Sequence, residues 1–115
     1  MGKQESASRT EIPPGTLYML ILKSLARLGP MHGYGIARHI QQQSEEVLQV
    51  EEGSLYPALQ RMLIKGWVLA EWGQSENNRR ARYYHLTPAG KKQLTAEISE
   101  FARVMAAIGR VIQPA

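Results

Sequence analysis

The stretch GSLYPALQRMLIKGWVLAEWGQSENNRRARYYHL, residues 53–86, joins a helix-forming half to two strand-forming segments. In the first half, apolar residues recur every three or four positions up to Gly66, which places them on one face of a helix. Segments 67–72 and 81–86 are rich in aromatic and aliphatic residues, and the polar run between them is typical of a hairpin turn. The stretch predicts a helix followed directly by a β-hairpin with arginines at its tip. The buried side of that helix is expected to hold Leu55, Leu59, Met62 and Leu63.

Two further helices are predicted upstream of this stretch. The first follows Thr16, a residue type that caps helices, and the second fits residues 34–43. Residues 47–50 are expected to form either a connector or a short strand. Ser54 is predicted to cap the third helix, with Pro57 in its first turn, where a missing N–H costs nothing. The apolar stripe of the first helix consists of Leu17, Leu20, Ile21, Leu25 and Leu28.

The last element is a long helix that begins after Thr87, with Pro88 at its first position. Apolar residues follow alternating spacings of four and three over nearly three heptads, which is the pattern of a coiled-coil seam. A helix of about 25 residues spans roughly 37 Å, more than so small a domain covers alone. The stripe therefore favours a partner helix from a second copy; packing on the chain's own first helix is the alternative, and both can hold. Its residues are Leu94, Ile98, Phe101, Met105, Ile108 and Ile112.

The predicted fold class is mainly α with a small β-hairpin (α+β), in the order of a winged helix-turn-helix with a long C-terminal dimerisation helix. In that layout the third helix enters the major groove and the hairpin lies along the neighbouring backbone. We expect a flexible N-terminal segment over residues 1–13, a DNA-binding domain over 14–86 and a dimerisation helix over 87–115.

The composition of the 115-residue chain is that of one globular domain without cysteine. Residues 53–92 carry seven basic and two acidic side chains, whereas the remaining residues have a net charge of −1. Such clustering indicates a polyanionic partner, although a chance cluster on a solvated surface is the alternative. The chain shows no apolar run of membrane-spanning length and no secretion signal at its start, so we expect a cytoplasmic protein with no membrane partner.

The sequence offers no pattern for catalysis or for a cofactor. The histidines, His32, His39 and His85, are scattered, and no metal-ligand spacing, P-loop or nucleophile motif is present. We therefore expect neither an enzyme nor a metal or cofactor site. His32 is expected to help cap the second helix, and both tryptophans are expected in the core or the hairpin.

Three motifs stand in a fixed order along the chain: HGYGI at 32–36, GSLYPAL at 53–59 and RRARYYHLTPAG at 79–90. Together they resemble the signatures of the PadR-like transcriptional regulators, over about residues 15–112, and their order and intervals make the resemblance specific. The chain departs from the family pattern at Tyr18, where an acidic residue is common. It departs again at Met62-Leu63, where Leu-Glu is common.

The resemblance implies a dimeric winged-helix regulator, usually a repressor, of the small subgroup with a single C-terminal helix. It also implies that this helix makes the dimer contacts, together with the first helix of the partner. Some larger relatives bind phenolic acids or other aromatic ligands between their subunits. An effector of this chain, if there is one, is not identified by its sequence. The expected dimer interface comprises Leu17, Leu20, Ile21, Leu94, Ile98, Phe101, Met105, Ile108 and Ile112.

The expected DNA contacts come from the third helix and the hairpin tip. Arg61 and Lys65 are expected to border the groove, and Tyr34 to reach a phosphate. For Tyr56, contact with a base and packing against the second helix remain open, and Arg82 is expected either in the wing or paired with Glu71. The groove candidates are Ser54, Tyr56, Pro57 and Gln60, and the wing candidates are Asn77, Asn78, Arg79 and Arg80.

These observations predict a sequence-specific DNA-binding transcriptional regulator that reads a pseudo-palindromic operator as a homodimer. Two other classes fit a basic winged helix: a module that grips an acidic protein partner, and an RNA-binding domain. The first predicts weak, sequence-blind DNA binding, and the second predicts a preference for structured RNA over duplex DNA.

Overall fold

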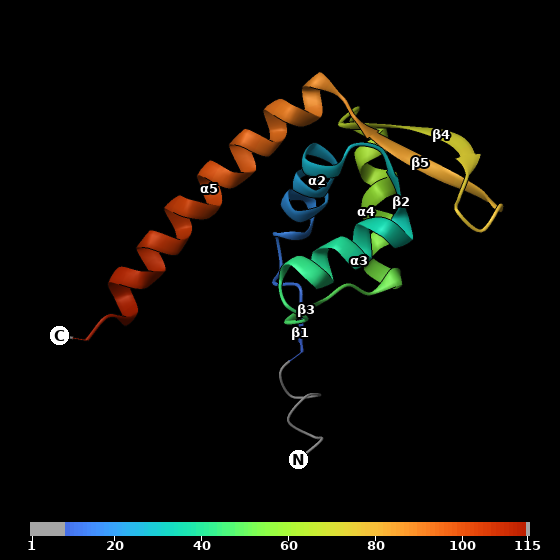
Figure 1. Ribbon diagram of the computed structural model, residues 1–115. Coiled ribbons are helices and arrows are strands. Elements are labelled where there is room, and N and C mark those ends of the chain that lie inside the picture. Colours follow the sequence, from blue (N-terminus) through green and yellow to red (C-terminus); the bar gives the residue numbers. More distant parts are fainter. Residues whose placement is uncertain (1–8, 115) are drawn as a thin grey trace, which may run out of the picture.

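The computed structural model describes residues 9–114, in which helices and short strands alternate before one long terminal helix. Figure 1 shows α2, α3 and α4 grouped beside the β4–β5 hairpin, with α5 extending away from them. The predicted α+β fold, a winged helix-turn-helix with a long C-terminal helix, is confirmed. In chain order the elements are β1 (Thr10–Glu11), α2 (Leu17–Leu28), β2 (Met31–His32), α3 (Gly33–Gln43), β3 (Leu48–Gln49), α4 (Glu52–Ile64), β4 (Val68–Gln74), β5 (Arg80–Leu86) and α5 (Pro88–Ile112).

The core lies where α2, α3 and α4 meet under the base of the hairpin. Each helix contributes its apolar face, so that Ile21, Ile36 and Leu59 have no exposed surface. Val68 and Tyr84 add the apolar side chains of β4 and β5 to the same cluster. Burial of apolar surface, at about 25 cal/mol per Å², is the main force that holds such a small fold together.

Side-chain caps begin two of the helices. The Nδ1 atom of His32 accepts a hydrogen bond from the Gly35 amide at 3.0 Å, and the Thr87 hydroxyl accepts one from the Gly90 amide at 3.0 Å. Both caps match the prediction, because each satisfies an amide that has no partner within its helix. Thr16 precedes α2 as expected, but its hydroxyl donates to the Pro13 carbonyl instead of accepting from a helix amide.

The start of α4 differs from the prediction. The amides of Ser54 and Leu55 both donate to the Glu51 carbonyl, at 3.0 and 2.9 Å, so Glu51 is the N-cap and Ser54 is already the third helical residue. The prediction that Ser54 caps the helix is wrong, and Pro57 consequently lies beyond the first turn. The earlier start also puts Glu52 in the first turn, where a negative charge is favourable to the helix dipole.

The hairpin is antiparallel along the full length of β4 and β5, and β2 adds a short third strand beside β5. Glu71 lies opposite Tyr83, so its side chain shares a face with His85, and the two side chains are 3.0 Å apart. The alternative in which Arg82 pairs with Glu71 is wrong. Arg82 is one residue off this register, and neighbouring residues on a strand point to opposite faces.

The chain before α2 is partly ordered by the connection between α3 and α4. Thr10–Glu11 pairs in parallel with Leu48–Gln49, so the expectation of a flexible segment over residues 1–13 is wrong at this pair. Hydrogen bonds between the two strands satisfy backbone groups that a flexible segment leaves to water. Residues 1–8 lie outside the described part of the chain. Residues 47–50 were expected to form either a connector or a short strand, and the structure has a short strand there, β3.

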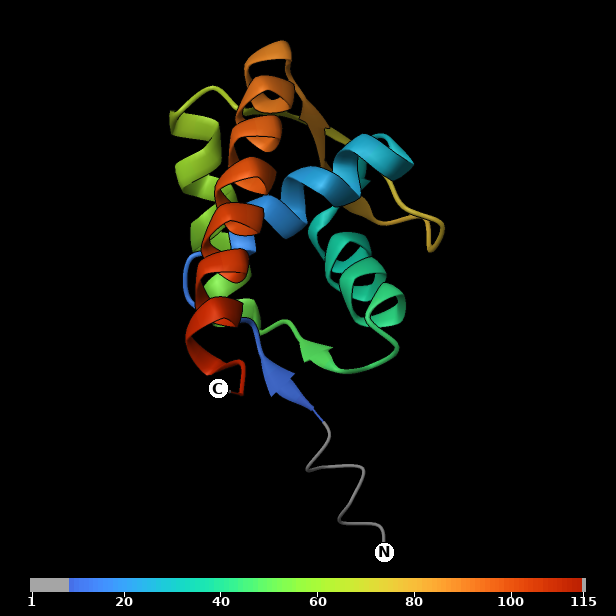
Figure 2. The same ribbon diagram turned by 90° about the vertical axis from the view of Figure 1, so that its left-hand side faces the viewer.

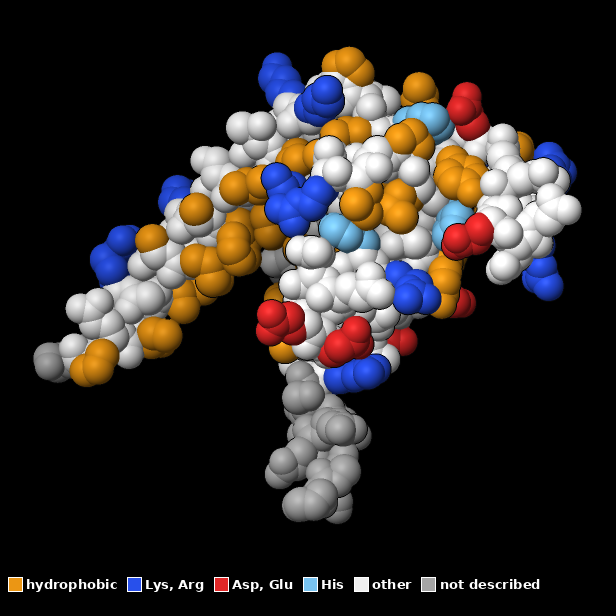
Figure 3. Space-filling view, in the orientation of Figure 1, with side chains coloured by type: hydrophobic (Ala, Val, Ile, Leu, Met, Phe, Trp, Pro, Cys, Tyr) orange, Lys and Arg blue, Asp and Glu red, His pale blue; other side chains and the backbone are white. Residues whose placement is uncertain are grey.

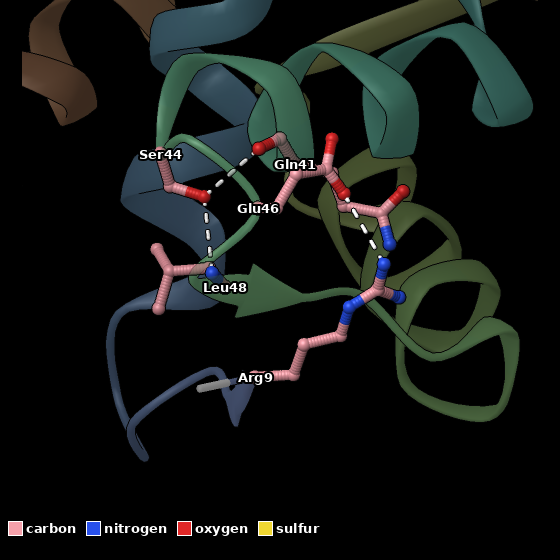
Figure 4. A network of polar contacts seen from close by, with 5 residues as sticks. All are labelled: Arg9, Gln41, Ser44, Glu46 and Leu48. Atoms are coloured by element: carbon pink, nitrogen blue, oxygen red, sulfur yellow. Dashed lines mark hydrogen bonds and ion pairs between the residues drawn. The ribbon is translucent and has the colours of Figure 1, made fainter. Parts of the chain in front are cut away.

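Polar contacts surround this two-stranded pairing (Figure 4). The Ser44 hydroxyl accepts a hydrogen bond from the Leu48 amide at 3.0 Å and donates to the Gln41 carbonyl at 3.1 Å. The Arg9 guanidinium lies 3.6 Å from the Glu46 carboxylate. Both groups of this ion pair are largely exposed, so it adds little to stability by itself. The contacts nevertheless tie the N-terminal segment to the connection that leads into α4.

The end of the hairpin is joined closely to α5. The Thr87 hydroxyl donates to the Gly66 carbonyl at 2.7 Å, and the Thr87 amide donates to the Trp67 carbonyl at 3.1 Å. Gly90, in the first turn of α5, lies directly against the backbone of Trp67, in the connection between α4 and β4. A Cβ atom added at Gly90 would stand only 2.1 Å from the Trp67 carbonyl oxygen.

We expect Gly90→Ala to lower the free energy of unfolding by about 2–3 kcal/mol, because the added methyl group overlaps a backbone oxygen that cannot move aside. Urea unfolding followed by circular dichroism measures this. The matched control is Gly53→Ala, where an added Cβ meets no atom within 4 Å. The control should unfold at the wild-type urea concentration or slightly above it. Equal stability of the two variants would contradict the close approach at Gly90.

Candidate nucleic-acid interface

The face of α4 that points away from the core is available to a partner. Its opposite side is buried, with Leu55, Leu59 and Met62 at 1% exposure or less. Pro57 and Gln60 lie on the exposed side, as predicted. An exposed polar and proline-bearing face on the third helix of a winged helix is where base contacts are made.

The basic residues of α4 lie along the edge nearest α2. The Nε atom of Arg61 donates a hydrogen bond to the Tyr18 hydroxyl, and its guanidinium lies 5.6 Å from the Tyr18 ring centroid. The Lys65 ammonium lies 5.2 Å from the Trp67 ring. Tyr18 thus provides a hydrogen bond and an aromatic face for Arg61. Ser54 borders the crevice against residues 11–15 instead of the outward face.

Tyr56 packs against the start of α3. A Cβ atom added at Gly33 would stand 2.6 Å from the Tyr56 ring, so only a glycine there leaves room for the ring. The ring is still 44% exposed. Burial, followed by the charge of Glu52, raises the pKa of the Tyr56 hydroxyl, which therefore stays protonated and able to donate at neutral pH. The structure accordingly gives Tyr56 a packing role and leaves its hydroxyl free to meet a phosphate.

Tyr34 stands on the first turn of α3 and is 60% exposed. Arg38, one helical turn later, places its guanidinium 5.8 Å from the Tyr34 ring, with a nitrogen 3.5 Å from the hydroxyl oxygen. Arg38 was not among the predicted DNA contacts. Arg38 follows Tyr34 by four residues, a spacing that puts both side chains on one face of a helix. This spacing could have identified Arg38 from the sequence.

The hairpin tip carries the remaining candidates. Residues 75–79 form the turn, where Asn78 adopts a left-handed φ of 61°, a conformation that asparagine tolerates better than most residues. Asn77, Asn78, Arg79 and Arg80 are all exposed. Figure 3 shows basic side chains gathered at the far end of the hairpin. Arg80 lies over the ring of Trp72, 4.5 Å from its centroid.

An open cavity of about 520 Å³ brings these elements together. It is bordered by the start of α3, by α4 and by the inner face of the hairpin. Three arginines of the wing region and one acid, Glu76, stand around it, so its charge is positive. Such a surface suits the phosphate backbone of a nucleic acid. Its aromatic and basic border includes His32, Tyr34, Tyr56, Trp72, Arg79, Arg80 and Arg82.

The long helix α5 presents an apolar face that the single chain leaves uncovered. Figure 2 shows α5 crossing beside α2, and a groove of about 420 Å³ separates it from residues 13–19. Figure 3 shows hydrophobic side chains along this face. The exposed candidates, between 39% and 74% exposed, are Ile98, Phe101, Met105, Ile108 and Ile112.

Two of the predicted interface residues belong instead to the core of the chain itself. Ile21 is 0% exposed and Leu94 is 8% exposed within one copy, so neither is available to a partner. Both residues belong to the hydrophobic core, Ile21 from α2 and Leu94 from the first part of α5. For Leu94, the alternative holds in which the apolar stripe of the last helix packs within the chain itself. Leu17 and Leu20 are half-buried against the same core.

A sequence profile of the transcriptional regulator PadR-like family matches residues 21–96, a span that includes α3, α4 and the complete hairpin. The chain belongs to the PadR-like family. Family members are transcriptional regulators and not enzymes, so this PadR-family protein is a DNA-binding regulator.

Individual relatives agree with this assignment. A PadR-family transcription regulator from Clostridium difficile R20291 is 28% identical, with a TM-score of 0.71, over 84% of this chain and 98% of that one. A transcriptional regulator from Clostridium thermocellum is 26% identical, with a TM-score of 0.79, over 86% of this chain and 95% of that one. A 37.1 kDa protein in transposon TN4556 of Streptomyces fradiae is 40% identical over 97 residues, which are 84% of this chain but 25% of that protein. This chain thus spans about a quarter of the Streptomyces protein.

The described part of the PadR-family chain holds no group of three or more metal-ligating side chains. Among residues 9–114, none of the helices is long and apolar enough to cross a membrane.

Burial, followed by the nearby charge of Arg27, lowers the pKa of His39, which favours its neutral form.

We expect Tyr56→Ala to lower the free energy of unfolding by about 2 kcal/mol, because it removes a half-buried ring from the surface of Gly33. Tyr56→Phe should stay within about 0.5 kcal/mol of wild type, since it keeps the ring that packs on Gly33 and removes only the hydroxyl. Thermal and urea unfolding of both variants provide the comparison. If Tyr56→Ala is as stable as Tyr56→Phe, the packing role assigned to the ring is wrong.

Proposed function

We propose that this PadR-family regulator is a repressor that binds a pseudo-palindromic operator as a homodimer. The observation that carries the proposal is the open cavity between the start of α3, Tyr56 of α4 and the hairpin, where Arg79, Arg80 and Arg82 give the lining a positive charge. We propose residues 14–86 as the DNA-binding unit and residues 87–115 as the dimerisation element. The regulator would act in the cytoplasm, where the chromosome is accessible.

The contacts fall into two groups by chemistry. Gln60 and Pro57 are exposed on α4, and a glutamine there can form the paired hydrogen bonds that select adenine in the major groove. Tyr34 and Tyr56 line the cavity, and their hydroxyl groups can donate to phosphates. The wing, with Asn77, Asn78, Arg79 and Arg80, supplies contacts to the backbone or the minor groove. Arg61 and Lys65 would border the duplex on the side of α2, whereas Ser54 faces the crevice beside residues 11–15.

Dimerisation through α5 would set the spacing of the two DNA-binding units. The exposed apolar face of α5 and the groove beside residues 13–19 offer a continuous apolar surface for the α5 helix of a second copy. A two-fold axis through such an interface relates the two α4 helices. Half-sites about 34 Å apart, one turn of B-DNA, would then meet both helices on the same side of the duplex. The interface would use Leu17, Leu20, Ile98, Phe101, Met105, Ile108 and Ile112.

In this proposal, the dimer represses transcription by occupying its operator. A dimer that covers two successive major grooves and the phosphates between them excludes polymerase from an overlapping promoter. The direct test is DNase I footprinting and gel-shift titration on the DNA upstream of the regulator's own gene, with random duplex and structured RNA as competitors. A protected two-fold symmetric site is expected. Equal affinity for random duplex, or a preference for RNA, would contradict the proposal.

We expect Arg80→Ala to weaken binding to operator and random duplex alike. Loss of one phosphate contact should reduce the slope of log K against log salt concentration by about one. Fluorescence anisotropy titrations at several salt concentrations measure the slope. Arg110→Ala is the matched control: it removes the same charge from the exposed end of α5, far from the cavity, and the slope should be unchanged. An unchanged slope in Arg80→Ala would remove Arg80 from the interface.

We expect Met105→Glu to convert the dimer to a monomer at micromolar concentration, because it places an unpaired charge in the apolar contact twice per dimer. Affinity for the complete operator should fall strongly, while each monomer keeps its fold. Light scattering and circular dichroism provide the two readouts. Ser99→Glu, which adds the same charge on the exposed side of α5, should remain dimeric. A dimeric Met105→Glu protein would place the interface elsewhere.

A further inference from the structure

The outer half of the hairpin extends beyond the body of the domain. The short strand β2 pairs only with Tyr83 and Tyr84, so the part of β5 nearer the tip has β4 as its sole neighbour in the described structure. A two-stranded ribbon without further packing is marginally ordered in water. The arginines at positions 79, 80 and 82 lie in or beside this outer half, and their directions therefore depend on local contacts.

Trp72 is the largest side chain of the outer half, and the core does not require it. On the same face of the hairpin, Tyr84 is buried in the core at 5% exposure, whereas Trp72 is 60% exposed. A β-branched residue would serve the strand as well as tryptophan does. An exposed tryptophan on the face that borders the positive cavity calls for a function other than folding.

The pairing of β4 with β5 shows which side chain Trp72 meets on this face. Gln74 lies opposite Arg80 and Trp72 lies opposite Arg82, so Trp72 and Arg80 are diagonal neighbours on one face. The Arg80 guanidinium lies 4.5 Å from the centroid of the Trp72 ring, nearer than Arg61 lies to Tyr18 or Arg38 to Tyr34. Tryptophan is also the strongest of the aromatic partners for a cation.

We propose that Trp72 is a positioning residue that holds Arg80 over the cavity, ready to contact a DNA phosphate. A free arginine loses much rotamer freedom when it binds, and an arginine already held on an indole face loses less. The stacked guanidinium keeps its edge N–H groups available for phosphate oxygens. This inference rests on the proposed function, because it requires that Arg80 contacts DNA.

The test is a double-mutant cycle on operator affinity with Trp72→Leu and Arg80→Ala, singly and combined. We expect Trp72→Leu to weaken binding about two- to five-fold, the range of an exposed cation–π contact. Trp72→Phe should recover most of this loss, because it restores an aromatic face. In the Arg80→Ala background, Trp72→Leu should cause no further loss, since Trp72 acts through Arg80. Additive losses would overturn the inference and show that Trp72 contacts DNA by itself.

A matched control separates positioning from simple weakening of the hairpin. Leu69 is also an exposed apolar residue of β4, at 62%, and lies on the opposite face from Trp72. Leu69→Ala should leave operator affinity unchanged; a loss as large as that of Trp72→Leu would assign the effect to hairpin stability and overturn the inference. Failure of the proposed function is recognised separately, because wild-type protein then shows no preference for the operator. If wild type binds its operator but Arg80→Ala has no effect, the inference is overturned while the operator proposal stands.

Discussion

The contact between the start of α5 and the connection from α4 to β4 determines how the two halves of this regulator are joined. Thr87 hydrogen bonds to the carbonyls of Gly66 and Trp67 in this connection, and Gly90 lets α5 approach the Trp67 carbonyl without a side chain between them. The residues that follow α4 are therefore bonded to the residue that precedes α5. In the proposed dimer, these hydrogen bonds would restrain the orientation of α4 relative to an axis along α5 within each chain.

The proposed DNA-binding surface is composite, and each of the three side chains below is contacted by a residue outside α4. Tyr56 rests on Gly33 of α3, Arg61 is held by Tyr18 of α2, and Arg80 is held by Trp72 within the hairpin. Aromatic rings thus hold the side chains of two arginines. Such contacts are individually weak, but they restrict long flexible side chains before DNA arrives and so reduce the entropy lost on binding.

Much of the architecture could be predicted from local patterns. The apolar periodicity placed α2 over the residues it occupies, the Thr87-Pro88 pair located the start of α5, and His32 was expected as a cap. The clustering of basic charge pointed to the segment that forms α4 and the wing. Three ordered motifs led to the PadR-like family, which the profile match confirms. Each of these features depends on residues close in sequence, whose geometry follows from helical or strand periodicity alone.

The sequence by itself determined the order of the four helices and the hairpin, the family and the residue types that can meet DNA, but not the short strands β1 and β2. The tertiary structure decided which side chains are free to do so. Ile21 and Leu94 carry the same apolar pattern as the exposed residues of α5, yet they are buried within one chain. The register of the hairpin paired Glu71 with His85 and separated it from Arg82. Trp72 entered the site because the hairpin borders one cavity with Tyr34 and Tyr56, and Arg38 entered it because it lines a second cavity that the same two tyrosines border. The periodicity of a sequence indicates which face of a helix or strand is apolar, whereas only the packing of the folded chain determines what covers that face.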